Sequence, residues 1–280
     1  MPRKQPTIRA IWLGEALRQI RDEAGLIAKD AGAHLGRDAS SITRMEAGEI
    51  PVGEDLLQRF MEMCGVADPH RRADLETIRN DAAQTGWWDG YRGDVLPHLM
   101  DRAWMESKAL HIKAFDITNL PGLLQTPEYA EAVMRTVNSS VSDAEIERWL
   151  EVRMTRQHIL TRHHPANLSC IIDECLLNRM AGGNTTMRNQ LDYILEVSYR
   201  PNIDIRILSG KKYLGTPGSF SIFELANPYP LVGYASTPVG DLCVEREKVD
   251  QLVHAYDRLS EVSLGVDTSR KKLKSERDKL

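Results

Sequence analysis

The feature that most restricts the fold is a pair of short helical segments joined by one tight turn, within residues 26–51. Gly36 separates the two segments, and Asp38 stands where the N-cap of the second helix is expected. Gly48 closes the second segment. The apolar side chains that recur at helical spacing are Ala31, Leu35, Ile42 and Met45. The pattern predicts a helix-turn-helix, in which two short helices cross steeply and pack through these residues.

Helical patterns continue on both sides of this motif. Apolar residues at helical spacing precede it and end at Gly25, and similar residues resume after Pro51. They are Ile11, Leu13, Leu17 and Ile20 before the motif, and Leu56, Leu57, Phe60 and Met63 after it. We therefore expect a helical bundle over residues 8–66. A mostly polar helix and a stretch rich in Gly and aromatic residues follow, which predicts a connector and linker over residues 67–97.

The second half of the chain begins with helical signals. Residues 100–112 carry an apolar face at helical spacing. Thr126 followed by Pro127 predicts an N-cap with proline in the first helical position. Ser142 and Glu145 have the spacing of a capping box, which opens a long helix. The first part of this half is therefore expected to be helical.

Strand signals then appear among further helices. Four short runs rich in β-branched or aromatic residues span residues 167–173, 202–208, 219–225 and 229–236. A helix over 184–199 separates the first two runs, and a last helix carries Val249 to Leu259. We expect a mainly α protein with a smaller α+β portion: a helix-turn-helix bundle, then an α+β regulatory domain over residues 98–265.

The last part of the sequence is basic. Residues 266–280 hold six cationic side chains, Arg270, Lys271, Lys272, Lys274, Arg277 and Lys279. A solvated basic end is the ordinary interpretation, and a contact with nucleic acid is the alternative. The rest of the chain offers little support for non-specific DNA binding, because its net charge is -4 and residues 9–65 carry seven Lys or Arg against ten Asp or Glu.

Composition excludes several other classes of protein. The chain of 280 residues is 42% hydrophobic and 27% charged, which suits a globular protein with a sizeable core. It has no apolar run long enough for a membrane span and no secretory signal, so we expect a cytoplasmic, nucleoid-associated protein. Four scattered cysteines predict buried free thiols rather than disulfides or a metal site.

The predicted second helix of the motif has a polar outer face suited to the major groove. Its residues are Arg37, Ser40, Ser41, Thr43 and Arg44. Arg44 can read guanine through its O6 and N7 atoms, and the serines can bond a base edge or a phosphate. A helical packing module without DNA contact is the alternative interpretation.

The run G-x-x-x-S-S-I-T-R-M-E-A-G, which begins at Gly36, resembles the recognition helix of the xenobiotic-response-element family of phage-repressor-like regulators. The resemblance implies base contacts by Ala39, Ser40 and Arg44. Many members of that family carry Gln or Ser near the start of the first helix of the motif, where it bonds a phosphate. Ala28 stands there in this chain, so that contact falls to backbone N–H groups or to Lys29.

Four segments of the second half carry a further resemblance when taken in order. They read LPGLLQTPEYAEAVM, RMTRQHIL, IIDECLLNRMAGG and GSFSIFEL. Together they resemble the WhiJ-like regulators of actinomycetes, which are antitoxin-like and developmental. The resemblance implies a transcriptional regulator, expected to be a repressor, that binds double-stranded operator DNA and a small BldB-like partner protein. We expect a homodimer.

Several polar residues of the second half are candidates for binding a partner or an effector. Gln125 lies in the PGLLQT segment, and Arg153, Arg156 and Gln157 share one predicted helix. Arg153 interrupts the apolar face of that helix and therefore needs an acidic partner or an anionic ligand. The acidic candidates are Glu106, Asp173 and Glu174. An internal salt bridge is the simpler alternative.

No catalytic motif was found in the sequence. It has no P-loop, no GxGxxG, no HExxH and no nucleophile elbow, so we expect no enzyme, no cofactor and no metal. Two alternatives to the regulator stay open. One is an antitoxin-like module that sequesters a protein and binds DNA only secondarily, and the other is a regulator that senses a small molecule.

Overall fold

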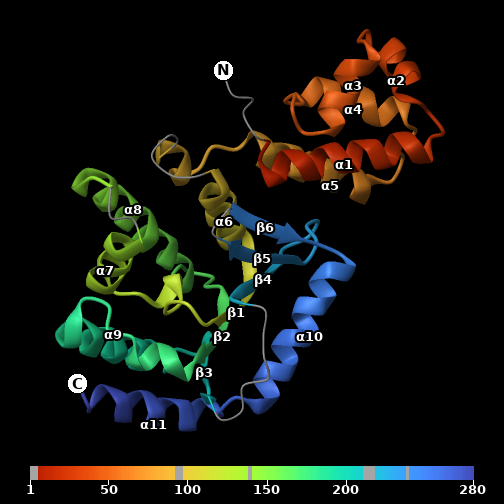
Figure 1. The fold of residues 1–280 in the computed structure, drawn as a ribbon. Coiled ribbons are helices and arrows are strands. Elements are labelled where there is room, and N and C mark those ends of the chain that lie inside the picture. Colours follow the sequence, from red (N-terminus) through yellow and green to blue (C-terminus); the bar gives the residue numbers. More distant parts are fainter. Residues whose placement is uncertain (1–5, 92–96, 138–140, 211–217, 238–239) are drawn as a thin grey trace. The chain divides into compact units, whose positions relative to one another are not determined.

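The computed structural model describes residues 6–91, 97–137, 141–210, 218–237 and 240–280. The chain divides into two compact units, one formed by residues 1–90 with 99–101 and the other by 91–98 with 102–280. Unit 1 is helical and unit 2 combines helices with one sheet (Figure 1). The predicted fold class, mainly α with an α+β portion, is confirmed.

Unit 1 is a bundle of short helices. Its elements are α1 (Ile8–Glu23), α2 (Ala28–Leu35), α3 (Ala39–Glu46), α4 (Glu54–Met63) and α5 (Pro69–Ala83). α1 and α3 bury the side chains that the spacing predicted, among them Leu17 and Ile42, both at 0% exposure. These apolar contacts hold the bundle together.

Helix α5, which the sequence predicted as part of a connector, packs against α1. Leu75 and Ile78 are buried on its inner face. Buried Arg9 of α1 donates from Nη1 to the carbonyl of Asp81 at 2.9 Å and to that of Gln84 at 3.0 Å, so it binds the end of α5. α5 is therefore a structural part of unit 1.

The turn between α2 and α3 forms where the sequence predicted it. Gly36 has φ 65°, in the left-handed region that favours glycine, and ends α2. Asp38 caps α3, as expected: its Oδ1 accepts the backbone N–H of Ser41 at 2.5 Å. The two short helices therefore form a helix-turn-helix.

Unit 2 is built on a six-stranded sheet with the order β3-β2-β1-β4-β5-β6. The strands are β1 (Ala109–Asp116), β2 (Asn167–Asp173), β3 (Ile203–Leu208), β4 (Phe220–Leu225), β5 (Val232–Thr237) and β6 (Gly240–Val244). β1, β2 and β3 are parallel, whereas β1–β4, β4–β5 and β5–β6 are antiparallel pairs. Four of these strands lie where the sequence predicted them.

Two strands, β1 and β6, were not predicted from the sequence. Leu110 to Ile112 were expected to extend a helix, but α6 (Pro97–Lys108) ends at Lys108 and β1 begins at the next residue. No Gly or Pro separates the two elements, so the sequence carries no break there. Pairing with β2 on one side and β4 on the other makes this segment extended, because tertiary contacts override weak local preference.

Helices cover both faces of the sheet (Figure 1). On one face, α10 (Glu247–Val262) packs Val249, Tyr256 and Leu259 against an apolar cluster of the sheet that includes Phe115 and Ile171. On the other side lie α7 (Pro127–Val137), α8 (Asp143–Arg156) and α9 (Gly183–Val197). The predicted capping box of Ser142 and Glu145 opens α8, and Thr126 caps α7.

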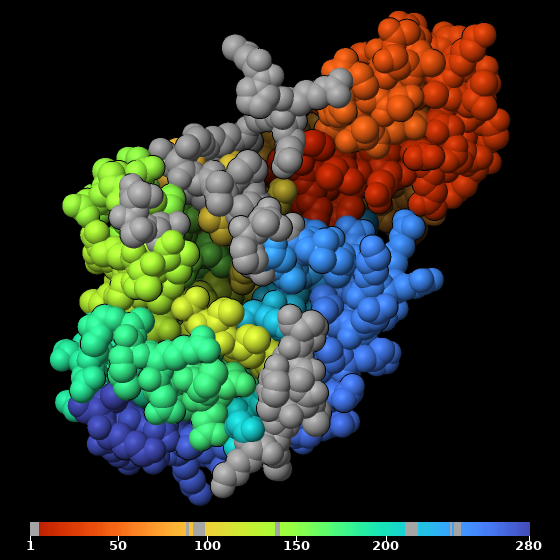
Figure 2. Space-filling view, in the orientation of Figure 1, coloured from red at the N-terminus to blue at the C-terminus, as the bar shows by residue number. Residues whose placement is uncertain are grey.

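Residues 266–277, expected within a basic tail, form helix α11 (Val266–Arg277), which packs along α9 and β3 (Figures 1 and 2). Leu273 is fully buried. Ser269 Oγ accepts the N–H of Ile207 at 2.9 Å, and the N–H of Leu264 donates to the Ile207 carbonyl at 2.9 Å. The charges are compatible with packing because several are paired: Lys272 lies 2.6 Å from Glu174.

Two kinds of feature are absent from the described residues. No helix there is long and apolar enough to cross a membrane. In the same residues, no group of three or more His, Cys, Asp or Glu could hold a metal ion. The cysteines are free thiols; Cys170 is buried, Cys64 is half-buried, and Cys175 and Cys243 are exposed, so burial of all four is not what the structure shows.

Candidate nucleic-acid interface

Helix α3 separates its buried and exposed residues as a recognition helix must. Ile42 and Met45 lie in the core at 0% and 1% exposure. Ala39, Ser40, Thr43 and Arg44 are exposed, and Ser41 is half-buried. The structure therefore brings five predicted contact residues onto one short helix, four of them exposed to solvent.

The start of α3 is held by Asp38. Its carboxylate accepts the Ser41 N–H, and this hydrogen bond lowers the pKa of Asp38. Asp38 therefore stays ionised at neutral pH and occupies the positive end of the helix dipole. This leaves the exposed side chains, rather than the N-terminal N–H groups of α3, as the candidates for a contact with nucleic acid.

Arg44 is available to DNA despite an ion pair. Its Nε lies 3.3 Å from Oε2 of Glu49, and the Arg44 side chain is 51% exposed. Exposed pairs of this kind contribute about 0–1 kcal/mol. A guanine or phosphate can therefore replace Glu49 at small cost.

Helix α2 presents the second group of predicted contacts. Lys29 is exposed near its start and Arg37 is exposed in the turn that follows it. Among the described residues, no side chain caps the N-terminus of α2, where Ile27 is the N-cap. Free N–H groups at a helix start attract phosphate, which suits the contact expected at Ala28 and Lys29.

A buried ion pair that the sequence analysis did not predict fixes the end of α3. Arg21 of α1 donates from Nε to Glu46 Oε1 at 2.5 Å and from Nη2 to Glu46 Oε2 at 3.0 Å. Both side chains are less than one tenth exposed. Glu46 belongs to the motif ending that carries the family resemblance, and its physical role here is to hold α3 on α1.

The same junction requires glycine at one position of α1. A Cβ on Gly14 would lie 2.3 Å from the carbonyl oxygen of Glu46. Contacts shorter than 3.0 Å between Cβ and backbone are essentially never seen. Gly14 therefore permits the close approach of α1 and α3.

In unit 2, five of the seven predicted partner or effector residues come together. Arg156 donates to Glu106 through Nε and Nη2, both at 2.7 Å, as the salt-bridge interpretation expected. Arg153 donates to Gln125 Oε1 at 2.6 Å, and Gln157 donates to the Gln125 carbonyl at 2.7 Å. These contacts join α6, the PGLLQT segment and α8.

The other two predicted residues have separate roles. Asp173 accepts the N–H of Cys175 at 2.8 Å and caps a short 3-10 turn. Glu174 pairs with Lys272 of α11 at 2.6 Å and accepts the N–H of Gly210 at 3.2 Å. Neither is an ion-pair partner of the α8 arginines in the described part of the chain.

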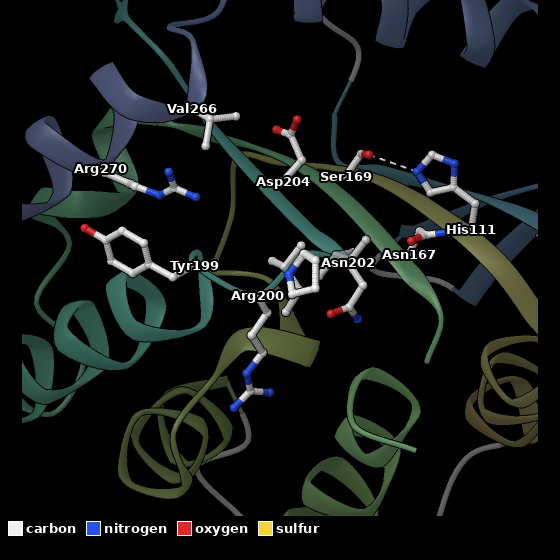
Figure 3. Close-up of a pocket in the computed structure, with 12 residues that line it drawn as sticks. His111, Asn167, Ser169, Tyr199, Arg200, Asn202, Asp204, Val266 and Arg270 are labelled. Carbon is white, nitrogen blue, oxygen red and sulfur yellow. Dashed lines mark hydrogen bonds between the residues drawn. The ribbon is translucent and has the colours of Figure 1, made fainter. Parts of the chain in front are cut away.

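A pocket of about 450 Å³ opens at the start of strands β2 and β3 (Figure 3). His111 Nε2 lies 2.9 Å from Ser169 Oγ, and the Arg270 guanidinium stacks 4.5 Å from the Tyr199 ring centroid. Burial lowers the pKa of His111. Sequence reasoning missed this pocket because His111 fell in a segment predicted to be helical.

The fold of unit 1 and the polar face of α3 define a helix-turn-helix protein of the DNA-binding class. Comparison with known families agrees: a profile described as a helix-turn-helix domain matches residues 12–75. A second profile, described as a domain of unknown function (DUF5753), matches residues 99–275, and the chain belongs to this family. No curated protein and no solved structure matches the chain.

Proposed function

We propose that this protein is a sequence-specific transcriptional regulator that inserts α3 into the major groove of operator DNA. The observation that carries the proposal is the division of α3 into a buried face, held by Ile42 and the Glu46–Arg21 pair, and an exposed face containing Ser40 and Arg44. A groove about 12 Å wide accepts a helix of this size. Repression is the proposed sign of regulation, and no catalytic step is part of it.

The contacts divide into two kinds. Ser40, in the first turn of α3, and Arg44, one turn later, are proposed to read bases, with about 1–3 kcal/mol of discrimination from a bidentate Arg–guanine pair. Lys29, Arg37 and the N-terminus of α2 are proposed to bind phosphates. Because residues 9–65 carry a net negative charge, affinity depends on this local surface and on pairing two copies of the chain.

We propose that unit 2 supplies dimerisation and regulation. A two-fold symmetric dimer would bind half-sites about one helical turn apart. The resemblance of the second half to WhiJ-like regulators supports a small BldB-like protein as the regulating partner, in a cytoplasmic setting near the nucleoid. An antitoxin-like protein that mainly sequesters this partner is the alternative.

The test is selection of binding sites from random duplex DNA with the full-length protein. We expect a palindromic consensus from the wild type, and no consensus from Arg44→Ala. The matched control is Arg18→Ala, which removes an exposed arginine of α1 whose ion pair with Asp22 also lies at the surface. The proposal is wrong if Arg44→Ala selects the wild-type consensus with wild-type affinity.

The same protein, purified from its host, distinguishes the regulator from the antitoxin-like alternative. If the wild type selects no DNA sequence but purifies from its host with one small protein in equal amounts, the sequestering function replaces the regulator. A consensus found together with that partner supports the regulator.

A further inference from the structure

A group of charged side chains lies inside unit 2, between the sheet and helices α6 and α8. Glu106, at 1% exposure, receives two hydrogen bonds from Arg156 and one from Arg102, whose Nε lies 3.1 Å from Glu106 Oε1. Although burial opposes it, these guanidinium groups lower the pKa of Glu106. One carboxylate therefore accepts three hydrogen bonds from two arginines.

A third arginine of the cluster lacks a counter-ion. The described residues place no carboxylate within ion-pair distance of Arg153, which bonds only the neutral amide oxygen of Gln125, at 2.6 Å. Its buried Nε has no hydrogen-bond acceptor in the same part of the chain. Burial, together with the charges of Arg156 and Arg102, lowers the pKa of Arg153 to about 9.

The free-energy cost of leaving Arg153 without a counter-ion indicates that an anion is needed beside it. A buried cation without a partner is destabilising, and proteins normally pair it or replace it by an apolar residue. Although the Nε atom of Arg153 is buried, the residue as a whole is only half-buried. Arg102 and Asp116 are also half-buried, so all three residues retain access to solvent. A ligand from solution can therefore reach a guanidinium group that needs an anion.

The residues around Arg153 determine the net charge of the cluster. Arg102 stacks 4.9 Å from the ring centroid of Tyr234, which fixes its guanidinium plane. Asp116 ends β1 beside Arg102, and burial raises the pKa of Asp116 to about 6. Three guanidinium groups thus face two carboxylates, and the cluster keeps a positive charge at neutral pH.

We infer that Arg153, with Arg102, forms a binding site in unit 2 for a small anion that carries a carboxylate or a phosphate group. The planar fork of a guanidinium matches both groups through two parallel N–H···O bonds. Arg156 and Gln125 act as positioning residues: Arg156 neutralises Glu106 and so keeps it from competing for Arg153, while Gln125 holds the Arg153 side chain. The site depends on unit 2 alone and does not rest on the proposed DNA binding.

The experiment measures thermal unfolding of the full-length protein with inorganic phosphate in one arm and succinate in the other. Sodium chloride at equal ionic strength is the reference for both arms. The test variant is Arg153→Met, which removes the charge but keeps an unbranched apolar chain. The matched control is Arg188→Gln, because Arg188 is an exposed arginine of α9 outside the cluster.

We expect one of the two anions to raise the Tm of the wild type and of Arg188→Gln by about 5–10 °C over chloride, at a concentration about one hundred times Kd. The arm that responds identifies the class of anion. Arg153→Met should show no such shift. Without anion it should melt above the wild type, since it removes an unpaired buried charge.

Three results would overturn the inference. They are a wild type that responds to neither anion beyond chloride, a shift in Arg153→Met equal to that of the wild type, and a lower Tm of Arg153→Met in chloride alone, which would make Arg153 a structural residue. If Arg153→Met does not fold, Arg153→Lys replaces it, because it keeps the charge but loses the fork. A tenfold or greater loss of anion affinity in that variant supports the site, and an unchanged affinity overturns it.

Discussion

The substitution Glu46→Gln tests how α3 is held in place. It keeps the size of the side chain but removes the negative charge that Arg21 meets at 2.5 and 3.0 Å. Removing one partner of a buried pair costs about 3–5 kcal/mol. Arg21 retains Asp22 at 2.5 Å and the Leu26 carbonyl at 2.7 Å, so we expect a loss near the lower limit, about 3 kcal/mol.

Hydrogen exchange of backbone amides in the full-length protein measures this loss within unit 1. A loss of about 3 kcal/mol corresponds to roughly 100-fold faster exchange in α1 and α3, where protection reflects opening of the bundle. Peptides from the sheet of unit 2 provide an internal reference. Under the proposed function, operator affinity should fall as well, although none of the residues proposed to contact DNA has changed.

The control is Glu49→Gln, which breaks the exposed Arg44–Glu49 pair on the same helix-turn-helix. We expect it to change exchange by no more than about fivefold, because such pairs contribute about 0–1 kcal/mol. Equal exchange in Glu46→Gln and wild type, within that margin, would refute the role assigned to the buried pair. So would an equal effect of the two substitutions.

Three further outcomes follow from packing and charge. Gly14→Ala should lower the stability of unit 1 by about 1–3 kcal/mol in urea unfolding, because the added Cβ would press on the Glu46 carbonyl. We expect this loss despite the better helix propensity of alanine. A more stable variant would contradict the close approach of α1 and α3. Leu273→Ala should cost about 2–5 kcal/mol in unit 2, whereas a solvated tail would cost nothing measurable. The raised pKa of Asp116 means that the folded protein binds an extra proton between about pH 4 and pH 6, so its stability falls as pH rises through that range. Asp116→Asn should remove that decline in a series of melting curves. An unchanged pH profile would show that desolvation does not raise the pKa of Asp116.

The helix-turn-helix was predictable because its signals are local. Gly36 and Asp38 each act within a few residues, through backbone conformation and a single capping bond. The alternation of buried Ile42 and exposed Arg44 follows from helical periodicity alone. The contact with α1 through Arg21 was not predictable, because 25 residues separate it from Glu46.

The second half shows the limits of local signals more clearly. The segment after Lys108 becomes a strand because it pairs with β2 and β4, which lie far along the chain. Without those partners, its sequence is equally compatible with a helix. The helical pattern indicated that a half-buried arginine in this helix needs a partner, and Glu106 is one of the three acidic residues that the sequence offered for Arg153 and Arg156. Which arginine would obtain that carboxylate depends on three-dimensional distance, and the sequence contains no signal for it.

Strand β3 is an edge of the sheet, with β2 as its only neighbour among the described strands. Its outward backbone groups at Ile207 are nevertheless occupied, by Ser269 of α11 and by the N–H of Leu264. An uncovered edge of Ile203, Ile205 and Ile207 would offer a template for strands of other molecules. A chain cut before Val266 should therefore aggregate through the exposed β3 edge. Helix α11 prevents that association by covering this edge.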